Sequence, residues 1–253
     1  MRDVSLRLVI SGLVIALFAF PALANPPANA IDVAALFQDV GAKMYPPSAT
    51  AGMKITSFKK DVMSKTLTVE FAAKGDNVLI EILTPRVDKG KYILKAKDDL
   101  WMYFSRLHRS IRIATRDSFM GTDASNYDLL ELDLVNDYEL ISHAEDKLEG
   151  LAVIRLELKA KANIKGYARI VSWLDPAQKI IIKNDCYAIS GSIIKTISYS
   201  DYKINGDFNI PMKTRIDSAT EPGRYSLVEF SAIKEDKNIN DNIFSLGYLE
   251  SLH

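Results

Sequence analysis

The chain has 253 residues, of which 48% are hydrophobic, and its 32 basic and 32 acidic residues leave a formal net charge of zero. This balance provides no basic excess that would favour binding to nucleic acid or to an anionic lipid surface. The single cysteine excludes an internal disulfide and a cysteine-rich zinc site.

The N-terminus has the pattern of a secretory signal peptide. Arg2 and Arg7 flank a short polar start, residues 8–20 are nearly unbroken apolar, and residues 21–24 read Pro-Ala-Leu-Ala. The apolar run is shorter than the roughly 18–20 residues that a membrane span requires, which disfavours an uncleaved anchor. We therefore predict a signal peptide over residues 1–24, cleaved after Ala24, and one mature domain over residues 25–253.

An amphipathic helix is predicted next. Apolar residues recur at helical spacing and form one stripe, which consists of Val33, Leu36, Phe37, Val40 and Met44. Asn29 is a suitable N-cap, and Pro46-Pro47 ends the pattern. The polar face has too few cations for a membrane-surface helix, so the stripe is expected to pack on a sheet.

From Gly52 onward the hydrophobic period is two, and short strands alternate with turns. Asn205-Gly206 is a strong two-residue hairpin signal. The strands expected after Gly52 are Leu67–Phe71, Val78–Leu83, Tyr92–Ala96, Leu100–Phe104, Arg109–Thr115, Tyr138–Ala144, Leu151–Ala160, Gly166–Leu174, Lys179–Ala188, Ile193–Ile204, Asn209–Ser218 and Tyr225–Ile233. Phe244, Leu246 and Leu249 are expected to dock a terminal turn or short helix.

The strand rhythm breaks over Asp117–Leu134. A short helical piece around Tyr127–Leu130 is predicted there, with Thr122 or Asp123 as its cap. A large antiparallel sheet cannot stay flat, because strand twist accumulates. The fold class is therefore mainly β: a strongly curved antiparallel sheet, or incomplete barrel, of about ten or eleven strands that covers the N-terminal helix and the short helical insert.

Residues that would support catalysis are sparse. The three histidines lack the spacing of a helical zinc site, and no nucleophile-elbow or phosphate-binding glycine motif occurs. His108 lies in a predicted turn between arginines, and Asp98-Asp99 is better explained as a turn than as a carboxylate dyad. We therefore predict that the protein is not an enzyme and has neither a metal site nor a cofactor.

An apolar surplus remains between Asp88 and Leu132, on strands that are apolar on both faces. Such a cluster is typical of a protein core, but it also suits the wall of a lipid-binding cavity. Arg109 shares its strand face with Ile111 and Ile113 and could contact the polar head of a bound lipid. The favoured interpretation is that Arg109 belongs to a charged outer rim. The candidate lipid-binding residues are Trp101, Tyr103, Phe104, Ile111, Ile113, Phe119, Met120, Tyr127 and Leu129.

The same segment carries a family resemblance. The pieces Asp99-Leu100-Trp101-Met102-Tyr103, Arg109–Ile113, Phe119-Met120-Gly121-Thr122-Asp123 and Tyr127-Asp128-Leu129 resemble the outer-membrane lipoprotein-sorting protein family, periplasmic relatives of the LolA and LolB carriers. Lys195-Thr196, Tyr199–Tyr202, Ile210-Pro211-Met212 and Asn240–Ser245 resemble its C-terminal half. The positions that match its motifs are Trp101, Tyr103, Phe119, Met120, Gly121 and Asp123.

The resemblance implies an incomplete LolA-like barrel with a helical lid, and a periplasmic, non-enzymatic carrier. Its partners would be acyl chains of a lipid or lipoprotein, which the carrier would pass toward the outer membrane as a monomer. An alternative is an accessory protein that acts through its surface on an inner-membrane transporter of the resistance-nodulation-division type.

Overall fold

The computed structural model describes residues 31–162 and 165–252. The chain divides into two units, Met1–Ile31 and Asp32–His253, and the described helices and strands belong to the second. The predicted signal peptide, its cleavage after Ala24 and the predicted cap Asn29 lie outside the described residues. None of the described helices is long and apolar enough to cross a membrane.

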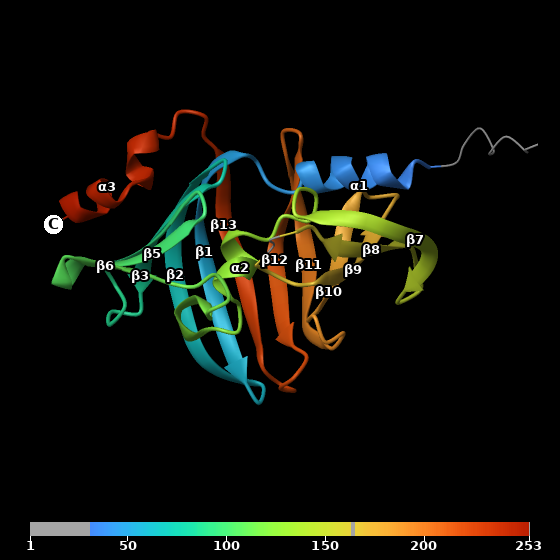
Figure 1. The fold of residues 1–253 in the computed structure, drawn as a ribbon, viewed down its shortest axis with the longest axis horizontal. Helices are drawn as coiled ribbons and strands as arrows, with labels where there is room; N and C mark the ends of the chain where they lie inside the picture. Colours follow the sequence, from blue (N-terminus) through green and yellow to red (C-terminus); the bar gives the residue numbers. More distant parts are fainter. Residues whose placement is uncertain (1–30, 163–164, 253) are drawn as a thin grey trace, which may run out of the picture. The chain divides into compact units, whose positions relative to one another are not determined.

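Thirteen strands form one antiparallel sheet, in the order β6-β5-β4-β3-β2-β1-β13-β12-β11-β10-β9-β8-β7 (Figure 1). The strands are β1 Ser48–Lys59, β2 Val62–Lys74, β3 Asn77–Thr84, β4 Lys91–Ala96, β5 Asp99–Phe104, β6 Arg109–Arg112, β7 Tyr138–Leu148, β8 Leu151–Ala160, β9 Arg169–Asp175, β10 Ile180–Tyr187, β11 Ile193–Asn205, β12 Phe208–Ser218 and β13 Tyr225–Glu235. The helices are α1 Val33–Ala42, α2 Asn126–Leu130 and α3 Leu246–Ser251, with 3₁₀ turns η1 Ser105–Leu107, η2 Phe119–Gly121 and η3 Asp241–Phe244. The predicted curved, unclosed antiparallel sheet is confirmed, with thirteen strands rather than ten or eleven.

The sheet consists of two meanders, β1–β6 and β7–β13, which are joined by a single pairing in the middle. β1 pairs with β13, and Ala49 lies opposite Glu235 in their register. The hydroxyl of Ser48 donates to the carbonyl of Asp236 at 2.5 Å, across 188 residues of sequence. The first and last strands of the sequence are thereby joined at the centre of the sheet, and β6 and β7 form its two edges.

The main hydrophobic core lies on one face of this sheet, which we call the inner face. Side chains at every second position of a strand point to this face. Ile170 and Leu174 of β9 are fully buried there. Leu156 and Leu158 of β8 are fully buried there as well. α1 and α2 pack against the same core, and α1 lies beside β10. The inner face is thus the one that the helices cover.

The helix α1 confirms the predicted apolar stripe as far as Val40, whereas Met44 lies beyond the end of the helix. Val33, Phe37 and Val40 are its buried residues. The N-cap is Asp32 and not the predicted Asn29, because the helix begins at Val33. The carboxylate of Asp32 accepts a hydrogen bond from the amide of Ala35 at 3.0 Å. The helix ends at Ala42, before the proline pair, because no further turn can continue into those residues.

The C-terminal segment covers the opposite, outer face. Phe244 and Leu249 are buried there against Leu79, Leu94 and Tyr103 of β3–β5, in a second and smaller core. The predicted docking of the chain end by Phe244 and Leu249 is confirmed.

Candidate functional site

Residues 113–137, which we call the flap, connect the edge strand β6 to the opposite edge strand β7. The flap contains η2 and α2, and Figure 1 shows α2 in front of the middle strands of the sheet. α2 begins at a capping box, in which the amide of Asp128 donates to the hydroxyl of Ser125 at 3.2 Å and the amide of Ser125 donates to the carboxylate of Asp128 at 2.7 Å. The predicted cap at Thr122 or Asp123 is therefore wrong: the hydroxyl of Thr122 instead donates to the carbonyl of Phe119 at 2.7 Å.

The underside of the flap is apolar and packs into the main core. Phe119 is 0% exposed and Tyr127 is 3% exposed. Met120, Leu129 and Ile113 are partly buried against the same core. The flap is therefore the element that separates the apolar inner face from solvent along the unclosed side of the sheet.

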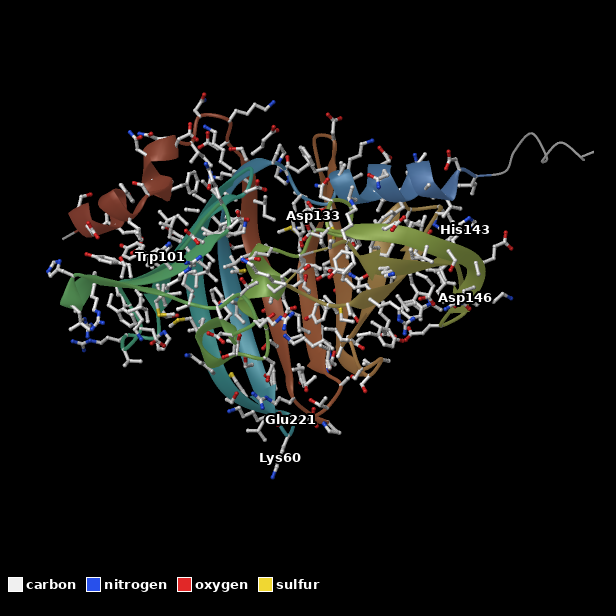
Figure 2. The ribbon with its side chains drawn as sticks, viewed as in Figure 1. Lys60, Trp101, Asp133, His143, Asp146 and Glu221 are labelled. Atoms are coloured by element: carbon white, nitrogen blue, oxygen red, sulfur yellow. The ribbon has the colours of Figure 1, made fainter. Side chains whose placement is uncertain are left out.

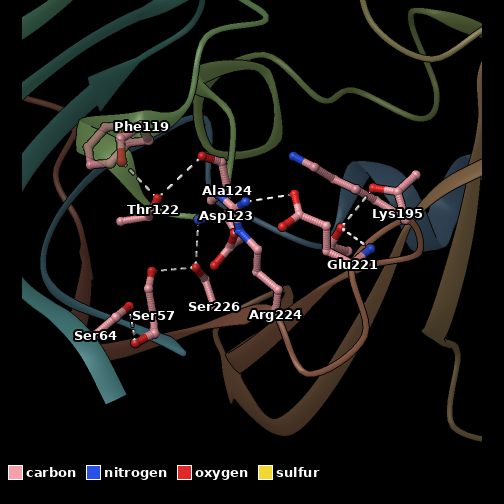
Figure 3. Close-up of polar contacts among 12 residues, drawn as sticks. Ser57, Ser64, Phe119, Thr122, Asp123, Ala124, Lys195, Glu221, Arg224 and Ser226 are labelled. Atoms are coloured by element: carbon pink, nitrogen blue, oxygen red, sulfur yellow. Dashed lines mark hydrogen bonds and ion pairs between the residues drawn. The ribbon is translucent and has the colours of Figure 1, made fainter. Parts of the chain in front are cut away.

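Polar contacts fasten one end of the flap to β13 and its preceding turn (Figure 3). The guanidinium of Arg224 pairs with the carboxylate of Asp123, whose side chain is 5% exposed. The amide of Asp123 donates to the hydroxyl of Ser226 at 3.0 Å, and that hydroxyl shares a second hydrogen bond with Ser57 of β1 at 2.7 Å. These contacts hold η2 against the two strands that form the centre of the sheet.

A buried acidic residue fastens α2. The carboxylate of Asp128, with a side chain 0% exposed, accepts hydrogen bonds from the hydroxyl of Tyr167 and from the ammonium of Lys195. Lys195 is on β11 and Tyr167 precedes β9, so this contact joins α2 to the second half of the sheet. A buried charge with a partner and further hydrogen bonds is stable where an unpaired one is not.

A third contact joins the flap to β2. The ammonium of Lys65 donates to the carbonyl of Met120 at 2.5 Å and pairs with Asp88 at 3.3 Å. Met120 has a φ of 52°, which turns its carbonyl out of the regular path of the 3₁₀ turn. The flap is therefore attached to the sheet in two ways: by the polar contacts at Asp123, Asp128 and Met120, and by the apolar packing of its underside.

Tyr127 of α2 forms a hydrogen-bonded group with two further tyrosines, Tyr138 and Tyr167. The hydroxyls of Tyr127 and Tyr138 are 3.1 Å apart, and the hydroxyl of Tyr138 donates to the carbonyl of Tyr167 at 3.2 Å. Burial, as the largest effect, raises the pKa of Tyr138 to about 12. These phenols are therefore neutral hydrogen-bonding groups and provide no base near neutral pH.

The structure divides the candidate residues between two faces. Phe119, Met120, Tyr127, Leu129 and Ile113 gather on the inner side, in or against the main core. Trp101 and Tyr103 lie on the outer face, against the core beneath the C-terminal helix; Figure 2 labels Trp101 on this side.

The other two candidates lie toward the free edge of the sheet. Phe104 is half-buried, with the ammonium of Lys91 5.6 Å from its ring centre, and Ile111 is 37% exposed. They therefore lie apart from the apolar underside of the flap.

A pocket of about 330 Å³ opens where the flap leaves β6. Leu100 and Ile113 form part of its wall and also belong to the packing of the main core. The complete lining consists of Asp98, Leu100, Arg112, Ile113, Ala114, Thr115, Arg116 and Lys165. Arg109, which the sequence singled out for a polar head, is not among these residues.

The residues considered for catalysis occupy turns. The turn before β5 consists of Lys97, with a φ of 55°, and Asp98, so the predicted turn at Asp98-Asp99 is displaced by one residue. Asp99 is the first residue of β5 and pairs with Arg112. His108 ends η1 with a φ of 45°. Among residues 31–162 and 165–252, no group of three or more histidine, cysteine or acidic side chains could hold a metal ion.

Cys186 is fully buried in the main core, on β10. Burial raises the pKa of its thiol, which lowers the fraction of reactive thiolate. We expect iodoacetamide to leave Cys186 unmodified in the native protein and to alkylate it completely in denaturant, as measured by intact mass. Rapid labelling without denaturant would contradict this burial.

A family model with the description "Uncharacterized protein" matches residues 74–251. The comparison with curated proteins finds no match.

Three solved structures share the fold. A domain named as an outer-membrane lipoprotein-sorting protein from Vibrio parahaemolyticus aligns over 86% of this chain and 97% of its own, with 23% identity and a TM-score of 0.73. A LolA superfamily protein from Nitrosomonas europaea aligns over 87% and 100%, with 20% identity and a TM-score of 0.75. A DUF1329 family protein from Desulfovibrio piger aligns over 87% and 100%, with 20% identity and a TM-score of 0.73. The chain therefore has the fold of these LolA-like structures, and it belongs to the family whose model matches residues 74–251.

Proposed function

We propose that this protein is a periplasmic carrier that binds the acyl chains of a lipid or lipoprotein between the inner face and the flap, and passes them toward the outer membrane. The observation that carries the proposal is the flap: an apolar underside on the unclosed side of a curved sheet, fastened by polar contacts. The lipoprotein-sorting and LolA-superfamily names of the structural neighbours support the same class of cargo.

In this structure the space beneath the flap is filled by its own side chains. Phe119 and Tyr127 belong to the same core as Leu67 and Val69, and all four are nearly or fully buried. An acyl chain would enter by displacing the flap, which exposes these rings, and would cover the inner face in their place. Each buried methylene contributes roughly 0.8 kcal/mol, so a long chain can offset the loss of the flap's own packing.

No chemical step is required for this role, because cargo enters and leaves by exchange of apolar contacts. The net affinity stays moderate because the flap competes with the cargo for the same surface. A carrier that must release its cargo benefits from that competition.

Lipid extraction and native mass spectrometry of protein purified from a periplasmic fraction test the proposal. We expect bound acyl lipid or, after delipidation, uptake of a fluorescent fatty acid. Leu129→Glu introduces a charge beside the partly buried underside of the flap and should weaken uptake at least about tenfold. Ile204→Glu is the matched control, because Ile204 is 83% exposed on a hairpin and should not affect uptake.

Circular dichroism and urea unfolding of both variants separate loss of binding from loss of fold. A wild-type protein that never carries or takes up any lipid or hydrophobic dye would contradict the carrier function. That result would favour instead the accessory role at a membrane transporter, exercised through the surface.

A further inference from the structure

The pocket where the flap leaves β6 combines an apolar wall with cationic side chains. Leu100 is 2% exposed and Ile113 is half-buried, and both belong to the packing of the main core. The pocket therefore adjoins the apolar interior at the point where the sheet is unclosed. A molecule that occupied it could extend an apolar part toward the core beneath the flap.

Three of the residues that line this pocket are cations, Arg112, Arg116 and Lys165, and one is an anion, Asp98. Arg112 pairs with Asp99 outside the lining set. The Nε of Arg116 donates to the carbonyl of Lys165 at 2.5 Å, and the ammonium of Lys165 donates to the carbonyl of Asp98 at 3.4 Å. Among the described residues, no carboxylate forms an ion pair with Arg116 or Lys165.

The lining residues include two more cations than anions, and three carboxylates contact the lining from outside it: Asp99 pairs with Arg112, and Asp117 and Glu131 accept hydrogen bonds from Ala114 and Thr115. Among the described residues, the lining cations without an ion pair are Arg116 and Lys165. Backbone carbonyls orient the two side chains but do not neutralise them. The remaining donors of a guanidinium suit a phosphate or carboxylate, with which it forms paired charge-assisted hydrogen bonds. Leu100 and Ile113 beside them make the pocket amphiphilic rather than simply basic.

We propose that this pocket binds the anionic head of an amphiphile whose acyl chain occupies the space beneath the flap. The proposal rests on the proposed carrier function and specifies its cargo: lipids with a phosphate or carboxylate head and no compensating positive charge. Phosphatidylglycerol and free fatty acids share this chemistry, whereas phosphatidylcholine and long-chain alcohols do not. Arg116 and Lys165 contact the head, and Leu100 and Ile113 contact the first carbons of the chain.

Competition binding to the delipidated full-length mature protein tests the proposal with lipids of matched acyl length. Dipalmitoyl phosphatidylglycerol is compared with dipalmitoyl phosphatidylcholine, and palmitate with hexadecanol, by displacement of a fluorescent probe. We expect the anionic member of at least one pair to bind about tenfold more tightly, a preference that declines with added salt. The pair that shows the preference identifies the head as phosphate or carboxylate.

The double variant Arg116→Gln/Lys165→Gln should lose this preference and retain its affinity for the neutral lipids. The matched control is Arg106→Gln/Arg109→Gln, which removes two exposed arginines near the same sheet edge that do not line the pocket. It should retain the preference, and circular dichroism checks that both double variants are folded.

The outcomes separate the two proposals. Failure of the wild-type protein to bind any of the four lipids overturns the carrier function itself. Equal affinity for anionic and neutral heads, or equal loss of preference in both double variants, overturns the assignment of this pocket and leaves the carrier function standing.

Discussion

Asp128→Ala is expected to lower the free energy of unfolding by about 3 kcal/mol. The substitution removes a fully buried carboxylate and leaves the ammonium of Lys195, 19% exposed on its side chain, without its ion-pair partner. It also removes an acceptor from the hydroxyl of Tyr167 and the capping box of α2. Urea unfolding followed by tryptophan fluorescence measures the change.

The matched control is an exposed ion pair on the same sheet. Lys213 pairs with Asp201 at 2.8 Å, with side chains 53% and 54% exposed, so Lys213→Ala should cost less than about 1 kcal/mol. A second comparison replaces both buried charges, Asp128→Leu with Lys195→Met, and should recover part of the loss because no charge is then left unpaired. Equal effects of Asp128→Ala and Lys213→Ala would show that the buried contact does not fasten α2.

Gly166→Ala should destabilise the protein by about 2–3 kcal/mol or displace the flap, because the site has no space for a methyl group. An ideal Cβ at Gly166 would lie 2.1 Å from Cζ and 2.6 Å from the hydroxyl oxygen of Tyr127. That ring is buried and hydrogen-bonded to Tyr138, so it cannot move without breaking the tyrosine group. Thermal unfolding gives the loss of stability, and near-ultraviolet circular dichroism reports the environment of the ring.

Two further variants identify the cause. Gly247→Ala introduces the same methyl group in α3, where nothing lies within 4 Å, and should be neutral or stabilising by about 0.5 kcal/mol. Tyr127→Leu removes the ring and should make the additional effect of Gly166→Ala much smaller. Additive effects of the two substitutions would contradict a direct clash between them.

Periodicity predicted the parts of this fold that depend on local pattern. The apolar stripe of α1 and the alternation of apolar residues in β8 and β9 arise because one side of each element is buried. Such one-sided burial is visible in the sequence as hydrophobic periodicity. β1 was not identified because its buried positions include Ala49 and Ala51, small residues that provide little hydrophobic contrast with Thr50 and Gly52.

The contacts that make the flap a distinct element could not be predicted in this way. Asp128 and Lys195 are 67 residues apart, and Asp123 and Arg224 are 101 apart. Each is an ordinary charged residue in its own segment, and only the three-dimensional fold pairs them. The two faces of β5 could not be assigned from the sequence either. Alternation separates Trp101 and Tyr103 from Leu100 and Met102. It does not show which of these two faces the C-terminal helix covers.

The pairing of β1 with β13 has a consequence for how the protein acquires its fold. The central ladder of the sheet forms only when residues near position 50 meet residues near position 230, a closure of nearly the whole described chain. Such non-local contacts slow folding, because the loop entropy is lost before the strand contacts are gained. A chain still being synthesised lacks β13, so β1–β6 and β7–β12 cannot join into one sheet until the last strand is made.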